Sequence, residues 1–106
     1  MIRVTPNLSI HESEVVVEFV RASGPGGQHV NKTSTAVELR FDVARSPSLT
    51  DEVRARLLTL AGQRLTTDGV LVIDARRFRS QKQNRDDALE RLLDLLRRAA
   101  HRPRVR

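Results

Sequence analysis

The chain has 106 residues, a formal net charge of +6, and no cysteine, tyrosine or tryptophan. This length fits one domain with one modest hydrophobic core, and the lack of cysteine excludes disulfides, thiol chemistry and thiolate metal sites. The histidines are scattered along the sequence and indicate no metal site: His11, His29 and His101. The N-terminus lacks the apolar core of a signal peptide, and no apolar run approaches the roughly 20 residues of a membrane span. We therefore expect an intracellular protein that binds no membrane, metal or cofactor.

The basic residues are mostly arginine and are concentrated toward the C-terminus. Seventeen of the 19 are arginine, and residues 76–106 hold ten arginines and one lysine against four acidic residues, a net of +7. A basic end on a near-neutral body indicates a polyanionic partner, and arginine favours phosphate because its planar guanidinium donates two hydrogen bonds. Nucleic acid is the favoured interpretation; a solvated helix face and an acidic membrane surface are the alternatives.

Two strands are predicted in the first half of the chain. Residues 14–20 are rich in β-branched side chains and read as a strand. In residues 35–41 the apolar Val37, Leu39 and Phe41 alternate with polar side chains, which predicts a half-buried strand. About fourteen residues separate the two strands, far more than a tight hairpin needs, and loops of that length are usually functional or disordered.

A helix, a turn and a third strand follow. Ser48 and Asp51 form a capping signature, and apolar residues then recur with helical spacing at Val53, Leu57, Leu60 and Ala61. We predict a helix over about 49–63, with Gly62 near its end. The sequence T-T-D-G at 66–69 predicts a turn, and V-L-V-I-D at 70–74 predicts a strand.

The second helix is predicted over about 81–100. Ser80 and Gln83 form a capping box before it, and Pro103 prevents much continuation after it. Its apolar stripe consists of Ala88, Leu89, Leu92, Leu93, Leu96 and Ala99. The order β-β-α-β-α predicts a small α+β domain, with a sheet of three or four strands packed against the two helices.

The loop between the first two strands contains the sequence G-P-G-G-Q-H-V-N at residues 24–31. It is not a Walker loop, because Lys32 is preceded by Asn31 rather than glycine, and it is not a dinucleotide fingerprint, because a strand follows it instead of a helix. A stacking platform of the usual RNA-reading kind is also disfavoured, since the chain has three phenylalanines as its only aromatic residues. The simplest interpretation is a mobile hairpin loop without chemistry.

The triplet Gly26-Gly27-Gln28 supports a catalytic interpretation. Glycine permits positive φ angles and lets the main chain approach a substrate closely, and a backbone N–H presented in this way can donate to a developing oxyanion. Glutamine offers a donor and an acceptor with no charge to titrate. If this loop catalyses, it acts by positioning and electrostatics, and the proton must leave through another group.

Two stretches of the chain resemble segments of class I peptide-chain release factors. Residues 21–40 resemble the catalytic segment and read R-A-S-G-P-G-G-Q-H-V-N-K-T-S-T-A-V-E-L-R. Residues 79–85 resemble the matching downstream segment and read R-S-Q-K-Q-N-R. Without codon-reading domains, the chain is most similar to the stand-alone, codon-independent ribosome-rescue hydrolases, the group of bacterial alternative ribosome-rescue factor B and its mitochondrial relatives. The resemblance covers residues 2 to about 104.

The resemblance implies a peptidyl-tRNA hydrolase that works only on the ribosome. The loop would enter the peptidyl-transferase centre of the large subunit and promote attack by water on the ester of P-site peptidyl-tRNA. The main-chain N–H of Gln28 would stabilise the oxyanion, Gly26 and Gly27 would give it its orientation, and the Gln28 side chain would admit water. The proton would leave through the 2′-hydroxyl of the tRNA and ribosomal groups.

Further residues are candidates for contacts with RNA. Arg21 and Lys32 at the base of the loop are expected to contact phosphate, and His29 is expected to contact RNA or to help the loop pack, with a role as base the less favoured alternative. Arg79, Gln81 and Arg85 are expected to support the loop or to bind ribosomal RNA. We expect residues 1–100 to form the catalytic domain and residues 101–106 to begin a basic tail, apparently truncated, whose candidates are Arg102, Arg104 and Arg106.

The resemblance also implies a tail that enters the mRNA channel of the small subunit where it is present, and we expect a monomer. The lack of an evident transit peptide favours a bacterial cytoplasm over a mitochondrion. Two alternative functions stay open: a non-catalytic module that binds ribosomes or structured RNA, and hydrolysis of free peptidyl-tRNA away from the ribosome.

Overall fold

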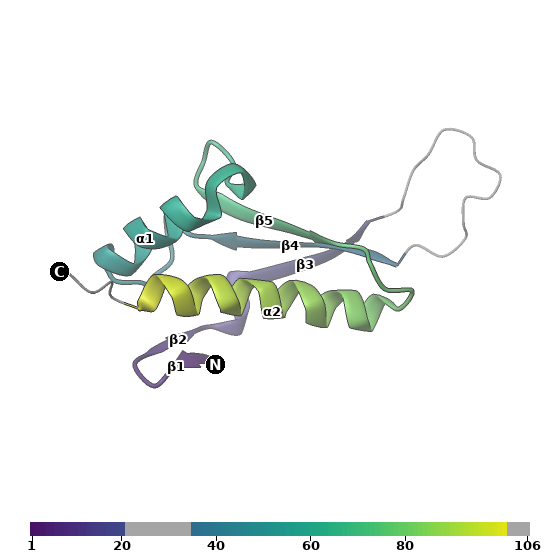
Figure 1. The fold of residues 1–106 in the computed structure, drawn as a ribbon, viewed down its shortest axis with the longest axis horizontal. Helices are drawn as coiled ribbons and strands as arrows, with labels where there is room; N and C mark the ends of the chain where they lie inside the picture. The colour runs from purple at the N-terminus through teal and green to yellow at the C-terminus, as the bar shows by residue number, and fades with distance from the viewer. Residues whose placement is uncertain (21–34, 102–106) are drawn as a thin grey trace.

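A computed structural model describes residues 1–20 and 35–101 of the chain (Figure 1). In the described parts, short 3-10 turns lie at Glu12–Glu14 (η1) and Gly62–Arg64 (η2). The strands and helices, in chain order, are β1 (Ile2–Thr5), β2 (Leu8–Ile10), β3 (Val15–Val20), β4 (Ala36–Asp42), α1 (Asp51–Ala61), β5 (Val70–Ala75) and α2 (Gln81–Ala100). The predicted α+β class is confirmed, as are the three strands and two helices that the pattern located.

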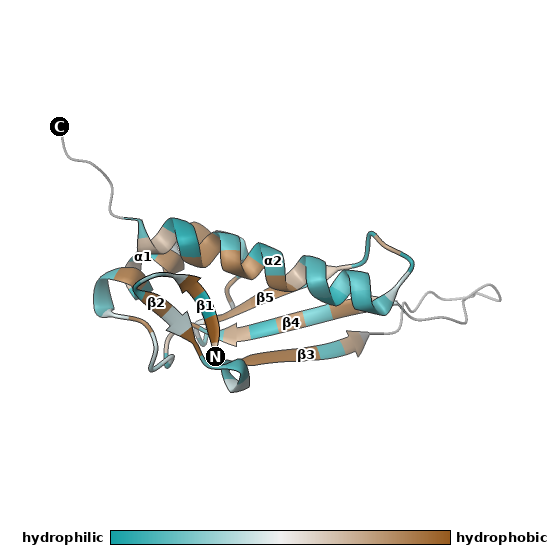
Figure 2. Cartoon of the chain, turned by 90° about the horizontal axis from the view of Figure 1, so that it is seen from below, coloured by the Kyte–Doolittle hydropathy of each residue, from teal (hydrophilic) through white to brown (hydrophobic). Residues whose placement is uncertain are grey.

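The main sheet has three antiparallel strands in the order β3-β4-β5, so β4 is central. Helix α2 lies along one face of this sheet, as Figure 2 shows, and α1 packs against the C-terminal half of α2. The strand alternation is confirmed, because Val37, Leu39 and Phe41 are each at most 1% exposed, while Glu38 and Arg40 form an ion pair at 3.0 Å on the other face. Burying apolar side chains of this size contributes about 1.5–3 kcal/mol each.

The sequence interpretation did not include the N-terminal hairpin. Strands β1 and β2 form a separate two-stranded sheet, in which Ile2 pairs with Ile10. Val4, Leu8 and Ile10 are buried in the same core as the main sheet, and β1 lies against α2 (Figure 2). Strands of three and four residues are too short to produce a readable alternation, so their burial against α2 decides the structure.

Helix α1 begins later than its capping signature predicted. Its N-cap is Thr50, whose hydroxyl accepts a hydrogen bond from the Val53 N–H at 3.2 Å. The prediction that Ser48 caps the helix is wrong, because its hydroxyl donates instead to Glu14 at 2.6 Å. The helix ends as expected at Gly62. Its φ angle is +54°, a conformation that residues with a side chain rarely adopt. Leu60, placed on the apolar side by its spacing, is in fact 37% exposed.

Helix α2 spans the predicted residues 81–100, and its cap is also confirmed. The Ser80 hydroxyl accepts a hydrogen bond from the Gln83 N–H at 3.2 Å. The predicted T-T-D-G turn forms before β5, where the Gly69 N–H donates to the Thr66 carbonyl at 3.0 Å. Within the described part of the chain, neither helix is long and apolar enough to span a membrane.

A polar network around Glu14 joins the start of β3 to the loop that precedes α1. The Glu14 carboxylate accepts hydrogen bonds from the hydroxyls of Ser46 and Ser48 and from the His11 N–H. Burial acts to raise the pKa of Glu14, but these hydrogen bonds and the charge of His11 outweigh it, so the pKa is lowered from its ordinary value. The ionised carboxylate therefore contributes to stability in the folded state.

We expect Glu14→Gln to lower the free energy of unfolding by about 1 kcal/mol at neutral pH, because the neutral amide accepts hydrogen bonds more weakly. Because the folded-state pKa lies below the unfolded value of about 4.3, this contribution is present above that pH and is lost as the pH falls through the folded-state pKa. The measurement is urea denaturation of the wild type and of Glu14→Gln at a series of pH values from neutral into acid. A stability difference that does not shrink in acid would contradict the assignment.

Candidate functional site

The Gly-Gly-Gln segment connects strands β3 and β4 at one end of the main sheet. Val20 pairs with Ala36 at that end, and the adjacent pair between β4 and β5 is Val37 with Ala75 (Figure 1). The link from β5 to α2, residues 76–80, leaves from the same end. Six predicted site residues belong to the connecting segment, which lies outside the described residues, and they stay predictions: Arg21, Gly26, Gly27, Gln28, His29 and Lys32.

Asn84 joins the two connections at this end of the sheet. Its side-chain amide Nδ2 donates to the Thr35 carbonyl at 2.6 Å and to the Phe78 carbonyl at 3.0 Å, while its Oδ1 accepts from the Phe78 N–H at 2.9 Å. Asn84 is fully buried, at 0% exposure. We call these three hydrogen bonds the Asn84 clamp. They tie the first described residue after the Gly-Gly-Gln segment to the link that precedes α2.

The sequence interpretation missed Asn84, although a signal was present. Asn84 lies four residues before Ala88 and eight before Leu92, in register with the apolar stripe of α2. A polar side chain at a core position of a helix is uncommon, and when buried it nearly always has hydrogen-bond partners. The pattern could therefore have identified Asn84 as a buried polar residue, but not the residues that it binds.

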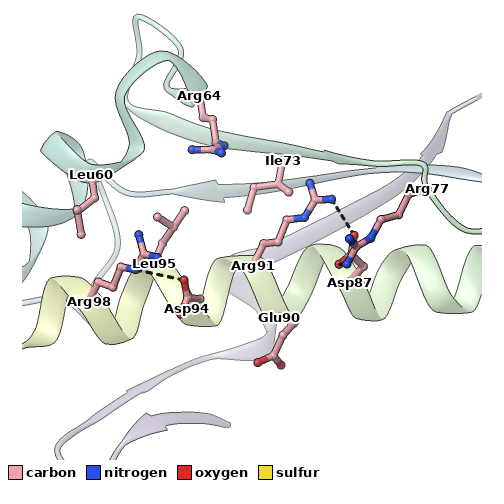
Figure 3. Close-up of a pocket in the computed structure, with 10 residues that line it drawn as sticks. All are labelled: Leu60, Arg64, Ile73, Arg77, Asp87, Glu90, Arg91, Asp94, Leu95 and Arg98. Carbon is pink, nitrogen blue, oxygen red and sulfur yellow. Dashed lines mark hydrogen bonds and ion pairs between the residues drawn. The ribbon is translucent and has the colours of Figure 1, made fainter.

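Charged side chains also hold the link between β5 and α2 against α2. Arg77 donates to Asp87 Oδ1 at 3.0 Å, and Arg91 Nη2 lies 2.9 Å from Asp87 Oδ2 (Figure 3). The second contact is an ion pair rather than a well-directed hydrogen bond, since Oδ2 has no partner of hydrogen-bond geometry. The Arg77 guanidinium also lies 5.1 Å from the centre of the Phe78 ring, and Arg91 donates to the Asp74 carbonyl at 3.0 Å.

These ion pairs line a hollow of about 450 Å³ between α2, β5 and the η2 turn. Figure 3 shows Arg77 and Arg91 pointing toward Asp87, and Arg98 pointing toward Asp94. Arg98 and Asp94 are 3.3 Å apart. Because three of its four arginines are neutralised by acids of α2, the hollow is a bracing surface rather than a strong anion site. The fourth, Arg64, has no hydrogen-bond or ion-pair partner in residues 1–20 and 35–101.

The structure brings the predicted residues Arg79 and Arg85 to the Asn84 clamp. Arg79 directly follows Phe78 and Arg85 directly follows Asn84, and both side chains are exposed. Neither has a hydrogen-bond or ion-pair partner among the described residues, so both cations are available to a ligand. Gln81 is the first residue of α2 and is exposed. Arg102, Arg104 and Arg106 lie outside the described residues.

Comparison with known proteins places the chain in a family. Residues 3–105 match the RF-1 domain, and the chain therefore belongs to the RF-1 domain family. It is 47% identical over 96 residues to the peptidyl-tRNA hydrolase ArfB of Pseudomonas putida, an alignment that covers 91% of this chain and 69% of that protein.

Two relatives from animals share less of the chain. The mouse large ribosomal subunit protein mL62 is 30% identical over 88 residues, which covers 83% of this chain and 43% of the mouse protein. The zebrafish (Danio rerio) mitochondrial translation release factor in rescue is 61% identical over 31 residues, or 29% of this chain and 20% of its own. The predicted resemblance to release factors and rescue hydrolases is confirmed at the level of the family.

We expect Asp87→Ala to lower the free energy of unfolding by about 1–2 kcal/mol, because it removes the shared partner of Arg77 and Arg91. The Asp87 side chain is only 9% exposed. Asp86→Ala is the matched control. The Asp86 side chain is 56% exposed, so its ion pair with Lys82 should contribute less than about 0.5 kcal/mol to stability. Urea denaturation compares them, and equal losses would show that Asp87 does not brace the link.

Proposed function

We propose that this protein hydrolyses the ester of peptidyl-tRNA on stalled ribosomes, without reading a codon. The observation that carries the proposal is the match to the RF-1 domain family over residues 3–105, a range that contains Gly26, Gly27 and Gln28 between β3 and β4. The identity to a bacterial peptidyl-tRNA hydrolase over 91% of this chain supports the same reaction. The named relatives from mouse and zebrafish support a ribosomal partner.

The proposed reaction is the attack of water on the ester carbonyl carbon. The carbon–oxygen bond to the terminal ribose then breaks, which gives a free peptide carboxylate and a tRNA hydroxyl. The Gln28 N–H donates to the oxyanion of the tetrahedral intermediate, and donors aimed at developing charge are usually the largest electrostatic contribution to such a reaction. Gly26 and Gly27 permit the backbone orientation that this requires, and the Gln28 side chain admits water while excluding other nucleophiles. The proton passes to the tRNA 2′-hydroxyl and ribosomal groups.

The proposed partner surface is ribosomal RNA near the peptidyl-transferase centre. Exposed arginines without a protein partner are suited to phosphate, because the planar guanidinium donates two hydrogen bonds and its charge releases counterions. Arg79 and Arg85 meet this description beside the Asn84 clamp. The other proposed contacts are Arg21, His29, Lys32, Gln81, Arg102, Arg104 and Arg106. We propose a monomeric protein of the bacterial cytoplasm, whose residues 1–100 form the catalytic domain and whose residues 101–106 begin a basic tail.

The second candidate function is a non-catalytic module that binds ribosomes or structured RNA. The net charge of +7 in residues 76–106, which exceeds the charge of the whole chain, favours it. Such a module would bind ribosomes and leave peptidyl-tRNA intact. Affinity that weakens with salt is expected of both functions, so a peptide-release assay must separate them.

We expect Gln28→Ala and Gly27→Ala each to lower the rate of peptide release on stalled ribosomes by at least about 100-fold, the usual effect of losing a preorganised oxyanion donor. Gln63→Ala is the control, because Gln63 is an exposed glutamine in the η2 turn. Folding should be unchanged in all three by circular dichroism. Release near the wild-type rate in both loop variants would refute the catalytic role, and fast hydrolysis of free peptidyl-tRNA would refute dependence on the ribosome.

We expect the double variant Arg79→Ala, Arg85→Ala to raise the KM for ribosomes and to reduce the salt dependence of binding by about 1–2 in logarithmic slope, because each phosphate contact contributes about 0.7–0.9. Arg64→Ala is the matched control, since Arg64 is also exposed and unpaired among the described residues but lies in η2. Ribosome binding is measured over a range of salt concentrations. An unchanged slope in the double variant would remove both arginines from the interface.

A further inference from the structure

We propose that Asn84 is a positioning residue for the Gly-Gly-Gln segment: its side-chain amide sets the place and direction from which that segment joins β4. This inference rests on the proposed function. Asn84 lies in α2 and is fully buried, so it acts on the reaction through Thr35 and the link rather than by touching the substrate.

The Asn84 clamp lies just beyond the last strand pairs that the structure describes at this end of the sheet. The last pair between β4 and β5 on this side is Val37 with Ala75. Beyond it, the carbonyl of Thr35 accepts a hydrogen bond from Asn84 Nδ2 at 2.6 Å. Asn84 also binds both the N–H and the carbonyl of Phe78, at 2.9 Å and 3.0 Å, in the manner of a backbone peptide group. The side chain thereby extends the hydrogen-bonded framework toward residues 21–34.

A second contact supports the same junction. The Thr35 hydroxyl donates to the Phe78 carbonyl at 3.4 Å, a long hydrogen bond that directly joins the two segments that Asn84 connects. The junction thus brings together three segments: the residue before β4 (Thr35), the β5–α2 link (Phe78) and α2 (Asn84). Because Asn84 is held by the core of α2, with Ala88 and Leu92 at 0% exposure, it transmits the rigidity of the helix to the end of β4.

Packing alone gives no reason for an amide at this position. Asn84 continues the apolar stripe of α2, and a buried polar group contributes to stability only when its hydrogen bonds are made. A leucine would fill such a helix position but would leave the backbone groups of Thr35 and Phe78 without these partners. Gln28 lies only seven residues before Thr35 in the chain, and small misplacements of reacting groups can cost about 100-fold in rate.

The experiment compares Asn84→Ala with Ser46→Ala in the wild-type background. Ser46 and Asn84 are the buried polar residues of the described part of the chain, at 3% and 0% exposure, but Ser46 belongs to the Glu14 network at the other end of β3. Peptide release is measured at saturating and limiting ribosomes, at a temperature where all proteins are folded by circular dichroism. Hydrogen exchange of the Phe78 N–H is measured in parallel.

We expect Asn84→Ala to lower kcat by at least about 10-fold while KM changes by less than about 3-fold, because positioning acts on the chemical step and not on ribosome binding. The Phe78 N–H, protected in the wild type, should exchange at least about 10-fold faster in the variant. Ser46→Ala should keep kcat and the exchange rate of the Phe78 N–H within about 2-fold of the wild type. If Asn84→Ala does not fold, Asn84→Ser, which replaces the amide with a single hydroxyl, should show the same changes to a smaller degree.

Three outcomes would overturn the inference: a folded Asn84 variant with wild-type kcat, an equal loss of kcat in Ser46→Ala, or a Phe78 N–H that exchanges freely in the wild type. Failure of the proposed function is distinguishable from these. In that case the wild type itself releases no peptide on ribosomes, although its Phe78 N–H is protected.

Discussion

The hydrogen bonds of the buried Asn84 amide are the constraint that defines the end of the main sheet from which the Gly-Gly-Gln segment leaves. Through one side chain of α2 they connect Thr35, the residue before β4, to the β5–α2 link, just beyond the described strand pairs. A buried amide is costly unless every polar atom has a partner. The same requirement that makes Asn84 stabilising also makes it directional, because its amide nitrogen and oxygen must face the backbone groups of Thr35 and Phe78. The Gly-Gly-Gln segment is therefore joined to a framework whose end is defined.

Among the arginines near the β5–α2 link and along α2, two groups have different consequences. Arg77 pairs with Asp87 and holds α2 against the link, and Arg91 joins the same acid to the Asp74 carbonyl of β5, whereas Arg98 pairs with Asp94 within α2. Arg79 and Arg85 have no partners in the described residues and lie beside the Asn84 clamp. Net charge alone could not separate these groups. The first group therefore braces the fold, and the second is available for the proposed contact with phosphate, so the basic character of the C-terminal half suits both the fold and the proposed interface.

Much of the fold could be predicted because its signals are local. The alternation of Val37, Leu39 and Phe41 identified the buried face of the central strand, and Ser80 identified the start of α2. The first helix cap was misassigned because Ser48 and Thr50 are both good capping residues. Only the packing of the pre-α1 loop against the η1 turn directs Ser48 to Glu14 and leaves Thr50 as the cap. The N-terminal hairpin was missed because its strands are too short to show a period.

By itself, the sequence determined the strand and helix pattern, the basic C-terminal half and the Gly-Gly-Gln segment with its family resemblance. Only the tertiary structure decided which polar residues meet. Thr35 and Asn84 are 49 positions apart, and their contact exists because α2 crosses β4 at one particular register. Periodicity records which face of an element is buried, since burial depends on local spacing. Periodicity does not predict which distant backbone group a buried side chain will bind, because that depends on how the elements pack.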